Sequence, residues 1–330
     1  MLVVACPGQG AQSPGMLAAW LEVDGVADLL TRASEVTGAD LVAHGTTSDA
    51  ETIRDTAVAQ PLLVATALAS LRAVLGAPLG TDLAQAVPGR VDAAAGHSVG
   101  ELAAAAVAGV LSDDDALALV AVRGAAMARA AAATPTGMSA VLGGDPDEVL
   151  ARLEALGLVA ANVNGGGQVV AAGTLDALAA LSAEPPTRAR VVPLQVAGAF
   201  HTSHMAPAVD ELAAAAARVA PRDPVVTLLG NADGAVVTTG ADARDRVVAQ
   251  VARPVRWDLC QRTLADLGVT GLLEVAPGGV LTGLARRTLP GVETVALKSP
   301  ADLDAARDLV RRHAGGAQPS PSTTTQESTS

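Results

Sequence analysis

Aromatic side chains are almost absent from this 330-residue sequence, which contains two tryptophans, one phenylalanine and no tyrosine. Proteins that bind single-stranded nucleic acids usually stack the bases on aromatic rings. Cationic residues are also in the minority, because the chain has 22 Lys and Arg but 34 Asp and Glu, which gives a net charge of −12. Binding to a phosphate backbone favours the opposite balance. We therefore expect no nucleic-acid partner, and a core built from Ala, Val and Leu.

Cysteine is equally scarce. Cys6 and Cys260 are too few for a disulfide framework, which favours a reducing, cytoplasmic environment. The N-terminal apolar run has no basic residue before it, so it is not typical of a signal peptide. The longest uncharged apolar-rich run, residues 56–71, contains Gln60 and Pro61 and is short for a bilayer span. We expect a cytoplasmic protein with no membrane segment.

Short apolar runs alternate with helix-like segments along most of the chain, which is typical of an α/β domain with a parallel sheet. Between residues 134 and 197 the order becomes βαββαβ, the pattern of ferredoxin-like domains. We predict a large α/β-hydrolase-like catalytic domain from 1–133 and 198–314, with the small ferredoxin-like domain, 134–197, inserted into it. Residues 315–330 are mostly Ser, Thr, Pro and Gln, a composition that predicts a disordered tail.

The segment Gly96-His97-Ser98-Val99-Gly100 fits the pattern G-x-S-x-G. It follows an apolar strand-like run, 91–95, and precedes a helix-like segment, 101–109. A tight strand-to-helix turn of this kind exposes the serine hydroxyl, and only small residues two positions away let the backbone pass. The backbone N–H after the serine then faces developing oxyanion charge. Ser98 is therefore a candidate nucleophile, although an ordinary glycine-bounded turn would show the same pattern.

A serine nucleophile needs a base within hydrogen-bond reach. The chain offers five histidines, at positions 44, 97, 201, 204 and 313. His97 is adjacent to Ser98, so its side chain should point elsewhere, and His44 and His313 have the surroundings of surface residues in loops or near the terminus. His201 and His204 lie between an apolar strand and a helix, where α/β folds present functional side chains. We favour His201 and keep His204 as its rival.

Arg123 interrupts an apolar helical stripe. The predicted helix starts at Ser112, a side-chain cap followed by three aspartates, and extends to about Ala133. The residues one and two helical turns from Arg123, including Met127, are all apolar. A buried guanidinium without a partner costs several kcal/mol. Either an internal carboxylate pairs with Arg123, or the side chain binds an anionic substrate.

Taken together in order, the motifs of this chain resemble those of malonyl-CoA:acyl-carrier-protein transacylases over about residues 1–312. The resemblance is carried by PGQGAQ near the N-terminus, GHSVGE around the candidate nucleophile, an arginine 25 residues later, NVN with GQVV in the small domain, GAFH at the candidate base, and PVRW and GGVLTGL near the C-terminus. One departure is at Gly278 or Gly279, where many relatives carry lysine. Such a change would affect phosphopantetheine or carrier contacts rather than the chemistry.

The resemblance implies roles for the catalytic residues. Ser98 would carry the malonyl group as an ester, and His201 would act as its base. The backbone carbonyl of Gln250 would orient His201 in place of a triad acid. The backbone N–H groups of Gln9 and Val99 would form the oxyanion hole.

The resemblance also implies a substrate pocket. Arg123 would bind the free carboxylate of the malonyl group, and Phe200 would narrow the pocket against branched acyl groups. Asn162, Asn164 and Met127 would complete the substrate contacts. No metal ligand and no resident cofactor is expected, since coenzyme A and phosphopantetheine enter as substrates.

The expected function is transfer of malonyl from malonyl-CoA to an acyl carrier protein by a ping-pong mechanism, performed by a monomer. The alternative is a serine hydrolase or thioesterase, which shares G-x-S-x-G but orders an acidic residue between serine and histidine. A non-catalytic carrier-binding protein is a third possibility. Acyl carrier proteins are acidic, and this chain also has a net negative charge. A local arginine patch should therefore offset the repulsion where the two proteins dock. Arg286 with Arg287, or Arg188 with Arg190, are candidates for it.

Overall fold

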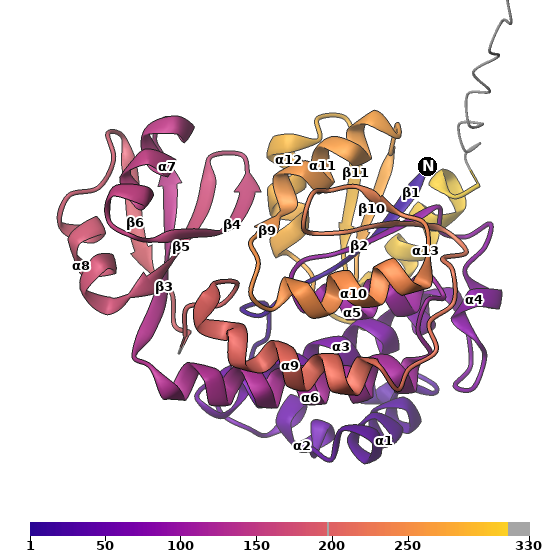
Figure 1. Cartoon of the computed structure of the whole chain (residues 1–330). Helices are drawn as coiled ribbons and strands as arrows, with labels where there is room; N and C mark the ends of the chain where they lie inside the picture. Colours follow the sequence, from indigo (N-terminus) through magenta and orange to yellow (C-terminus); the bar gives the residue numbers. More distant parts are fainter. Residues whose placement is uncertain (197, 316–330) are drawn as a thin grey trace, which may run out of the picture.

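Two β-sheets lie side by side in the computed structural model, which describes residues 1–196 and 198–315 (Figure 1). The sheet on the right of Figure 1 belongs to the larger part of the chain, and the sheet on the left to the segment around 136–193. The mixed α/β class expected from the sequence is confirmed. The predicted disordered tail lies outside the described residues, except for Gly315.

The large sheet has six strands in the order β11-β10-β1-β2-β7-β8. The first five run parallel, and β8 pairs antiparallel with β7 at one edge. The strands are β1 (Leu2–Cys6), β2 (Ala93–Gly96), β7 (Thr227–Leu229), β8 (Val236–Val237), β10 (Gly271–Glu274) and β11 (Glu293–Ala296). Parallel strands are usually covered on both faces, and every residue of β1, β2 and β10 is buried.

Helices cover both faces of this sheet. Alternate residues of a strand point to opposite faces, and Leu2 and Val4 pack into one hydrophobic cluster whereas Val3 and Ala5 pack into another. The second cluster contains α11 (Trp257–Asp266) and α12 (Val280–Thr288). The first contains residues of nine described helices: α1 (Val26–Thr37), α2 (Leu41–Thr46), α3 (Thr56–Leu75), α4 (Leu83–Ala86), α5 (Gly100–Val107), α6 (Asp113–Ala133), α9 (Ala206–Ala216), α10 (Gly240–Gln250) and α13 (Leu303–His313).

Helix α3 is the central helix of the larger cluster and is apolar on all sides. Among the residues that the structure describes, it is one of two helices, with α6, that are long and apolar enough to cross a membrane, and 89% of its most apolar window is buried inside the protein. A helix that is hydrophobic all round is expected in the core of a large domain. Pro61 lies within its first turns, one position after the buried Gln60.

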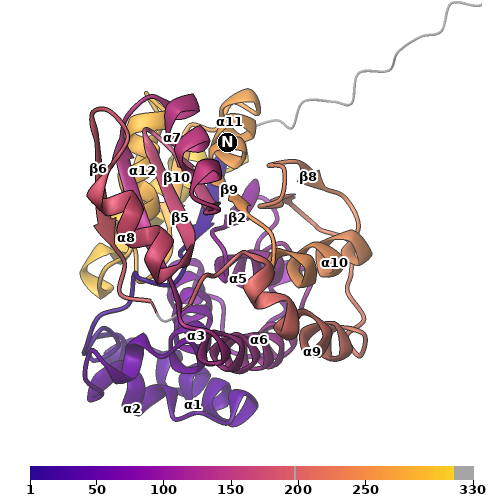
Figure 2. The ribbon, with the colours of Figure 1, turned by 60° about the vertical axis from the view of Figure 1, so that its left-hand side comes forward.

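The small sheet has five strands in the order β6-β3-β5-β4-β9. Four come from the segment with the βαββαβ order, and they pair antiparallel: β3 (Thr136–Gly143), β4 (Val159–Gly165), β5 (Gln168–Thr174) and β6 (Ala189–Pro193). The helices α7 (Pro146–Ala155) and α8 (Leu175–Ala183) share a hydrophobic cluster with them, and Figure 2 shows both helices in front of the sheet.

The fifth strand of the small sheet, β9 (Val255–Arg256), comes from a distant part of the chain. It pairs parallel with β4, where Asn162 lies opposite Val255. The sequence did not indicate this strand, because two residues carry no detectable alternation. Its pairing joins the small sheet to the segment that leads into α11.

Candidate active site

The carboxyl ends of four neighbouring strands meet at one edge of the large sheet, where two of the candidate residues lie. Gln9 follows β1, Ser98 follows β2, Asn231 follows β7 and Gly279 follows β10. In parallel sheets these ends form the crevice where ligands bind. A cleft of about 230 Å³ opens there, lined from the large part of the chain by Ser98 and His201 and from the small sheet by Asn162 and others.

Ser98 lies on a sharp turn between β2 and α5, with a backbone φ of 55°. The flanking glycines are required by contact. A Cβ atom on Gly96 would lie 2.0 Å from the carbonyl oxygen of Gly100, and one on Gly100 would lie 2.2 Å from the carbonyl oxygen of Cys6. No side chain fits at such distances, so the G-x-S-x-G pattern reflects close packing of the turn against β1 and α5.

His201 lies against the serine hydroxyl. Its Nε2 is 2.7 Å from Ser98 Oγ, and its Nδ1 is 2.8 Å from the backbone oxygen of Gln250. Since a carbonyl only accepts, Nδ1 carries the proton and Nε2 is free to accept one from Ser98. Burial, together with the nearby Arg123 charge, lowers the pKa of His201 to about 3. The imidazole is therefore neutral at physiological pH, as a general base must be.

The other histidines do not reach the serine hydroxyl. His204 lies in a short 3₁₀ turn, and its backbone N–H donates to Thr202 Oγ1. His97 turns toward the small sheet, where its Nε2 lies 2.8 Å from Asn164 Oδ1. The expectation that His44 lies in a loop is wrong, because it lies in α2, whereas His313 ends α13 near the terminus as expected; both residues are partly buried.

Arg123 is 1% exposed and has neutral partners. Its Nη1 donates to Gln60 Oε1 at 2.7 Å, and its Nη2 donates to Gln250 Oε1 at 2.6 Å. Within residues 1–196 and 198–315 it forms no ion pair, so the internal carboxylate partner that the sequence left open is not found there. Burial lowers the pKa of Arg123 to about 10, and the charge of Glu101 opposes this shift. A buried cation bound only to neutral oxygens remains available to an anion.

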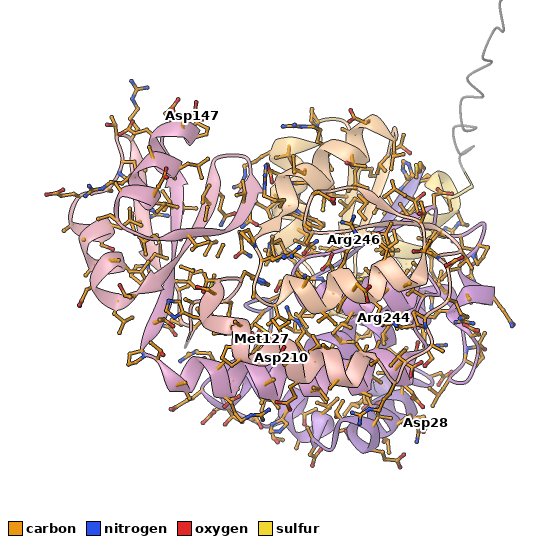
Figure 3. The ribbon with its side chains drawn as sticks, in the orientation of Figure 1. Asp28, Met127, Asp147, Asp210, Arg244 and Arg246 are labelled. Atoms are coloured by element: carbon orange, nitrogen blue, oxygen red, sulfur yellow. The ribbon has the colours of Figure 1, made fainter. Side chains whose placement is uncertain are left out.

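The cleft lining contains most of the predicted substrate contacts. Phe200, Met127, Asn162 and Asn164 all line it, and Figure 3 shows Met127 on α6 near the middle of the molecule. Arg123 does not line the cleft. It lies one hydrogen bond beneath Gln60, which does, so an anion must displace that side chain to reach the guanidinium.

The two predicted oxyanion donors have free backbone N–H groups. Among the described residues, neither the N–H of Gln9 nor that of Val99 donates to another protein group. Gln9 lines the cleft, and Val99 directly precedes the first residue of α5, where the helix dipole favours negative charge.

Three buried polar residues that hydrogen-bond around Ser98 and Arg123 were not predicted as site residues. Gln60, Glu101 and Asn231 are each no more than 5% exposed. Gln60 interrupts an apolar run before a proline, which was a visible signal. In the sequence, Glu101 looks like an ordinary acidic residue in the first turn of a helix, and the residues around Asn231 form no recognisable motif. Only the tertiary structure therefore reveals these two residues.

A serine on a strand-to-helix turn with a neutral histidine base can accept an acyl group and pass it on. That is the chemistry of acyl transferases, and residues 3–304 match the family model described as acyl transferase domain.

Individual relatives narrow the family. The chain is 53% identical to the malonyl CoA-acyl carrier protein transacylase of Mycobacterium bovis over 94% of this chain and 100% of that protein. It is 35% identical to the protein of the same name from Escherichia coli K12 over 92% and 97%. The crystal structure of MCAT from Mycobacterium tuberculosis superposes with a TM-score of 0.86 at 52% identity, covering 93% of this chain and 99% of that one. The chain belongs to the malonyl CoA-acyl carrier protein transacylases, which confirms the resemblance found in its motifs.

Proposed function

We propose that the chain transfers a malonyl group from malonyl-CoA to the phosphopantetheine thiol of an acyl carrier protein, through an ester on Ser98. The carrying observation is the Ser98 Oγ to His201 Nε2 distance of 2.7 Å above a buried arginine that has no ion pair among the described residues. Coenzyme A and phosphopantetheine enter this scheme as substrates.

In the first half-reaction Ser98 Oγ attacks the thioester carbonyl while its proton passes to His201 Nε2. The bond from Ser98 Oγ to the acyl carbon forms, the carbon–sulfur bond breaks, and the proton leaves with the thiol of coenzyme A. The carrier thiol reverses these steps in the second half-reaction. General-base help is worth about 10²–10⁴-fold in rate. Each N–H of Gln9 and Val99 that stabilises the oxyanion would contribute about 3–4 kcal/mol.

The malonyl carboxylate would be bound by Arg123 in this scheme. Gln60 covers the guanidinium, and within the described part of the chain its Nε2 donates to the Met127 sulfur alone, at 3.5 Å. A thioether is a weak acceptor, so the Nε2 hydrogen bond of Gln60 costs little to break, and the hydrogen bond from Arg123 Nη1 to Gln60 Oε1 would be exchanged for one to the carboxylate. The planar guanidinium then offers two parallel hydrogen bonds to the carboxylate.

The serine hydrolase reading is not retained. His201 is oriented by the Gln250 carbonyl, whereas the esterases that share G-x-S-x-G use a carboxylate. Buried Arg123 would also have no role toward a neutral ester.

The two sheets suggest how the chain is divided into domains. We propose that residues 1–133 and 198–314 form an α/β-hydrolase-like domain and that 134–197 form a ferredoxin-like one, acting together as a cytoplasmic monomer. In support, the four antiparallel strands of the small sheet follow the order fourth, first, third, second in the chain, with a helix in each βαβ half.

The carrier protein would approach over α12. This helix starts with Val280, which is 52% exposed and lines the cleft, and it ends with the exposed Arg286 and Arg287. Lys298 has its Cε 3.5 Å from where a Cβ on Gly279 would lie, so a cation flanks the same loop although the lysine of many relatives is absent. This face therefore combines apolar surface with positive charge beside the entrance.

Covalent labelling tests the function. Mixing the chain with malonyl-CoA should add the mass of one malonyl group, and a carrier protein carrying phosphopantetheine should remove it. Ser98→Ala should show no added mass. Loss of the label to water at the same rate with and without carrier would contradict the proposal and favour a hydrolase.

A further inference from the structure

A buried polar cluster lies behind Ser98, on the side away from the cleft. It consists of Glu101 from α5, Asn231 after β7, and Gln250 at the end of α10, and these side chains are 5%, 0% and 4% exposed. None of the three lines the cleft. Only the backbone carbonyl of Gln250 has a part in the proposed mechanism, so the carboxylate of Glu101 is a buried charge without a stated role.

Both carboxylate oxygens of Glu101 accept hydrogen bonds. Oε1 accepts from the backbone N–H of Asn231 at 2.6 Å, and Oε2 accepts from Nε2 of Gln250. A protonated carboxyl or an amide at this position would present a donor to one of these two donors. The two contacts therefore favour the ionised carboxylate, which accepts at both oxygens.

Glu101 thereby sets the orientation of the Gln250 side-chain amide. The amide nitrogen lies among three acceptors: Glu101 Oε2, the backbone oxygen of Ser98 at 2.8 Å and Asn231 Oδ1 at 3.2 Å. The amide oxygen must then point the other way, where it accepts from Arg123 Nη2 at 2.6 Å. A flipped amide would set oxygen against oxygen at Glu101 and two donors against each other at Arg123.

The same cluster fixes the nucleophile. Asn231 Oδ1 accepts from the backbone N–H of Ser98 at 2.8 Å, and Asn231 Nδ2 donates to the backbone oxygen of Gly96 at 2.7 Å. Asn231 in turn is held by Glu101 through its own N–H. One carboxylate thus supports both the turn that carries the nucleophile and the guanidinium beneath the cleft.

We propose that Glu101 is a positioning residue that determines selectivity for malonyl over uncharged acyl groups, an inference that rests on the proposed function. Its carboxylate orients the Gln250 amide so that the neutral amide oxygen faces Arg123. This contact aligns the guanidinium without neutralising its charge. A carboxylate in direct contact would occupy the cation. Placed behind Gln250, the charge of Glu101 favours a protonated Arg123 and leaves its hydrogen-bonding edge to the substrate.

The arrangement is sensitive to pH. Burial raises the pKa of Glu101 to about 7, against the opposing influence of the Asn231 and Gln250 hydrogen bonds and of the Arg123 and Arg246 charges. Figure 3 shows Arg246 on α10, the helix that also carries Gln250. The Cys260 thiol, the other titratable group that interacts with Glu101, has its pKa raised by burial and stays neutral. Acidification below about pH 7 therefore protonates Glu101 and removes the acceptor that orients Gln250.

The test compares Glu101→Gln with wild type. The measured quantity is the rate of Ser98 acylation by malonyl-CoA and by acetyl-CoA, followed by rapid quenching and intact mass. We expect the malonyl/acetyl ratio of the variant to fall by about 10- to 100-fold, mostly through weaker malonyl binding, since a misoriented amide leaves buried donors unsatisfied. Asp92→Asn is the matched control: Asp92 is 8% exposed and accepts from Leu2 N–H at the opposite end of the same sheet. It should leave the ratio unchanged.

The pH profile gives a readout that a purely structural role would not move. In wild type the malonyl/acetyl ratio should fall as the pH drops from 8 to 6, and in Glu101→Gln it should be flat. A wild-type ratio that does not change between these pH values would overturn the inference even if the variant fails to fold. If Arg123→Ala collapses the ratio but folded Glu101→Gln does not, the inference on Glu101 is wrong while the proposed function stands. If Arg123→Ala also leaves the ratio unchanged, the carboxylate-binding role of Arg123 is itself wrong.

Discussion

Replacing Arg123 by alanine should change which acyl group the chain accepts. The guanidinium is 1% exposed and donates to the oxygens of Gln60 and Gln250 at 2.7 and 2.6 Å, with no carboxylate partner among the described residues. In the variant a malonyl carboxylate would enter a buried site without its cation. Removing one partner of a buried ion pair costs about 3–5 kcal/mol. At about 1.36 kcal/mol per tenfold change, this corresponds to a loss of roughly 10²–10⁴-fold in malonyl transfer.

Acetyl transfer provides the internal reference, because the acetyl group has no carboxylate to lose. The assay is the initial rate of Ser98 acylation from malonyl-CoA and from acetyl-CoA, with Arg123→Lys as the matched variant. Lysine keeps the charge but lacks the planar fork, so its malonyl/acetyl ratio should lie between those of wild type and Arg123→Ala. An Arg123→Ala chain that folds and keeps the wild-type ratio would refute the reasoning.

Three further predictions follow from the geometry. His201→Ala should slow acylation by about 10²–10⁴-fold while His204→Ala largely retains it, and equal losses in both would undo the assignment of the base. The pKa of His201 is lowered to about 3, so between pH 6.5 and 3 the unfolded chain binds one proton more than the folded chain. The free energy of unfolding should therefore fall on acidification by about 1.36 kcal/mol per pH unit from this group. In urea unfolding measured across this pH range, His201→Asn should show a smaller slope than wild type. Gly100→Ala should prevent stable folding, since its Cβ would lie 2.2 Å from Cys6 O, whereas Gly283→Ala on α12 meets nothing within 4 Å and should be neutral or stabilise by about 0.5–1 kcal/mol in thermal unfolding.

The nucleophile turn could be predicted because its determinants are local. Gly96, Ser98 and Gly100 lie within five positions, between an apolar strand and a helix, and the close contact at Gly96 is with Gly100 in the same turn. The close contact at Gly100 is with Cys6 of β1, which only the tertiary structure brings there. Secondary structure was also largely predictable where a hydrophobic pattern continued over many residues or where a helix-capping side chain was present. The helix opened by Ser112 is an example, because its side chain accepts from the N–H of Asp115 as expected.

Short elements were not predictable. The strand β9 has two residues, and the strand with which it pairs, β4, lies about ninety positions earlier. The helix α13 and the strand β11 were likewise not indicated, although α13 has a clear apolar side with buried Leu309 and Val310. Strands as short as β9 and β11 gain their stability from tertiary contacts rather than from their own sequence, whereas the apolar side of α13 is a signal that the sequence contains and that was missed.

The amino-acid order by itself determined the class of fold, the exposed serine and the conflict posed by an arginine among apolar neighbours, because each depends on residues within a few helical turns or one strand. The tertiary structure alone decided that His201 and not His204 meets a serine 103 positions away, and that Arg123 faces the amide oxygens of Gln60 and Gln250. It also revealed the support by Glu101. The physical reason is that these contacts join separate elements whose relative placement is set by burial of the whole core, which no local pattern records.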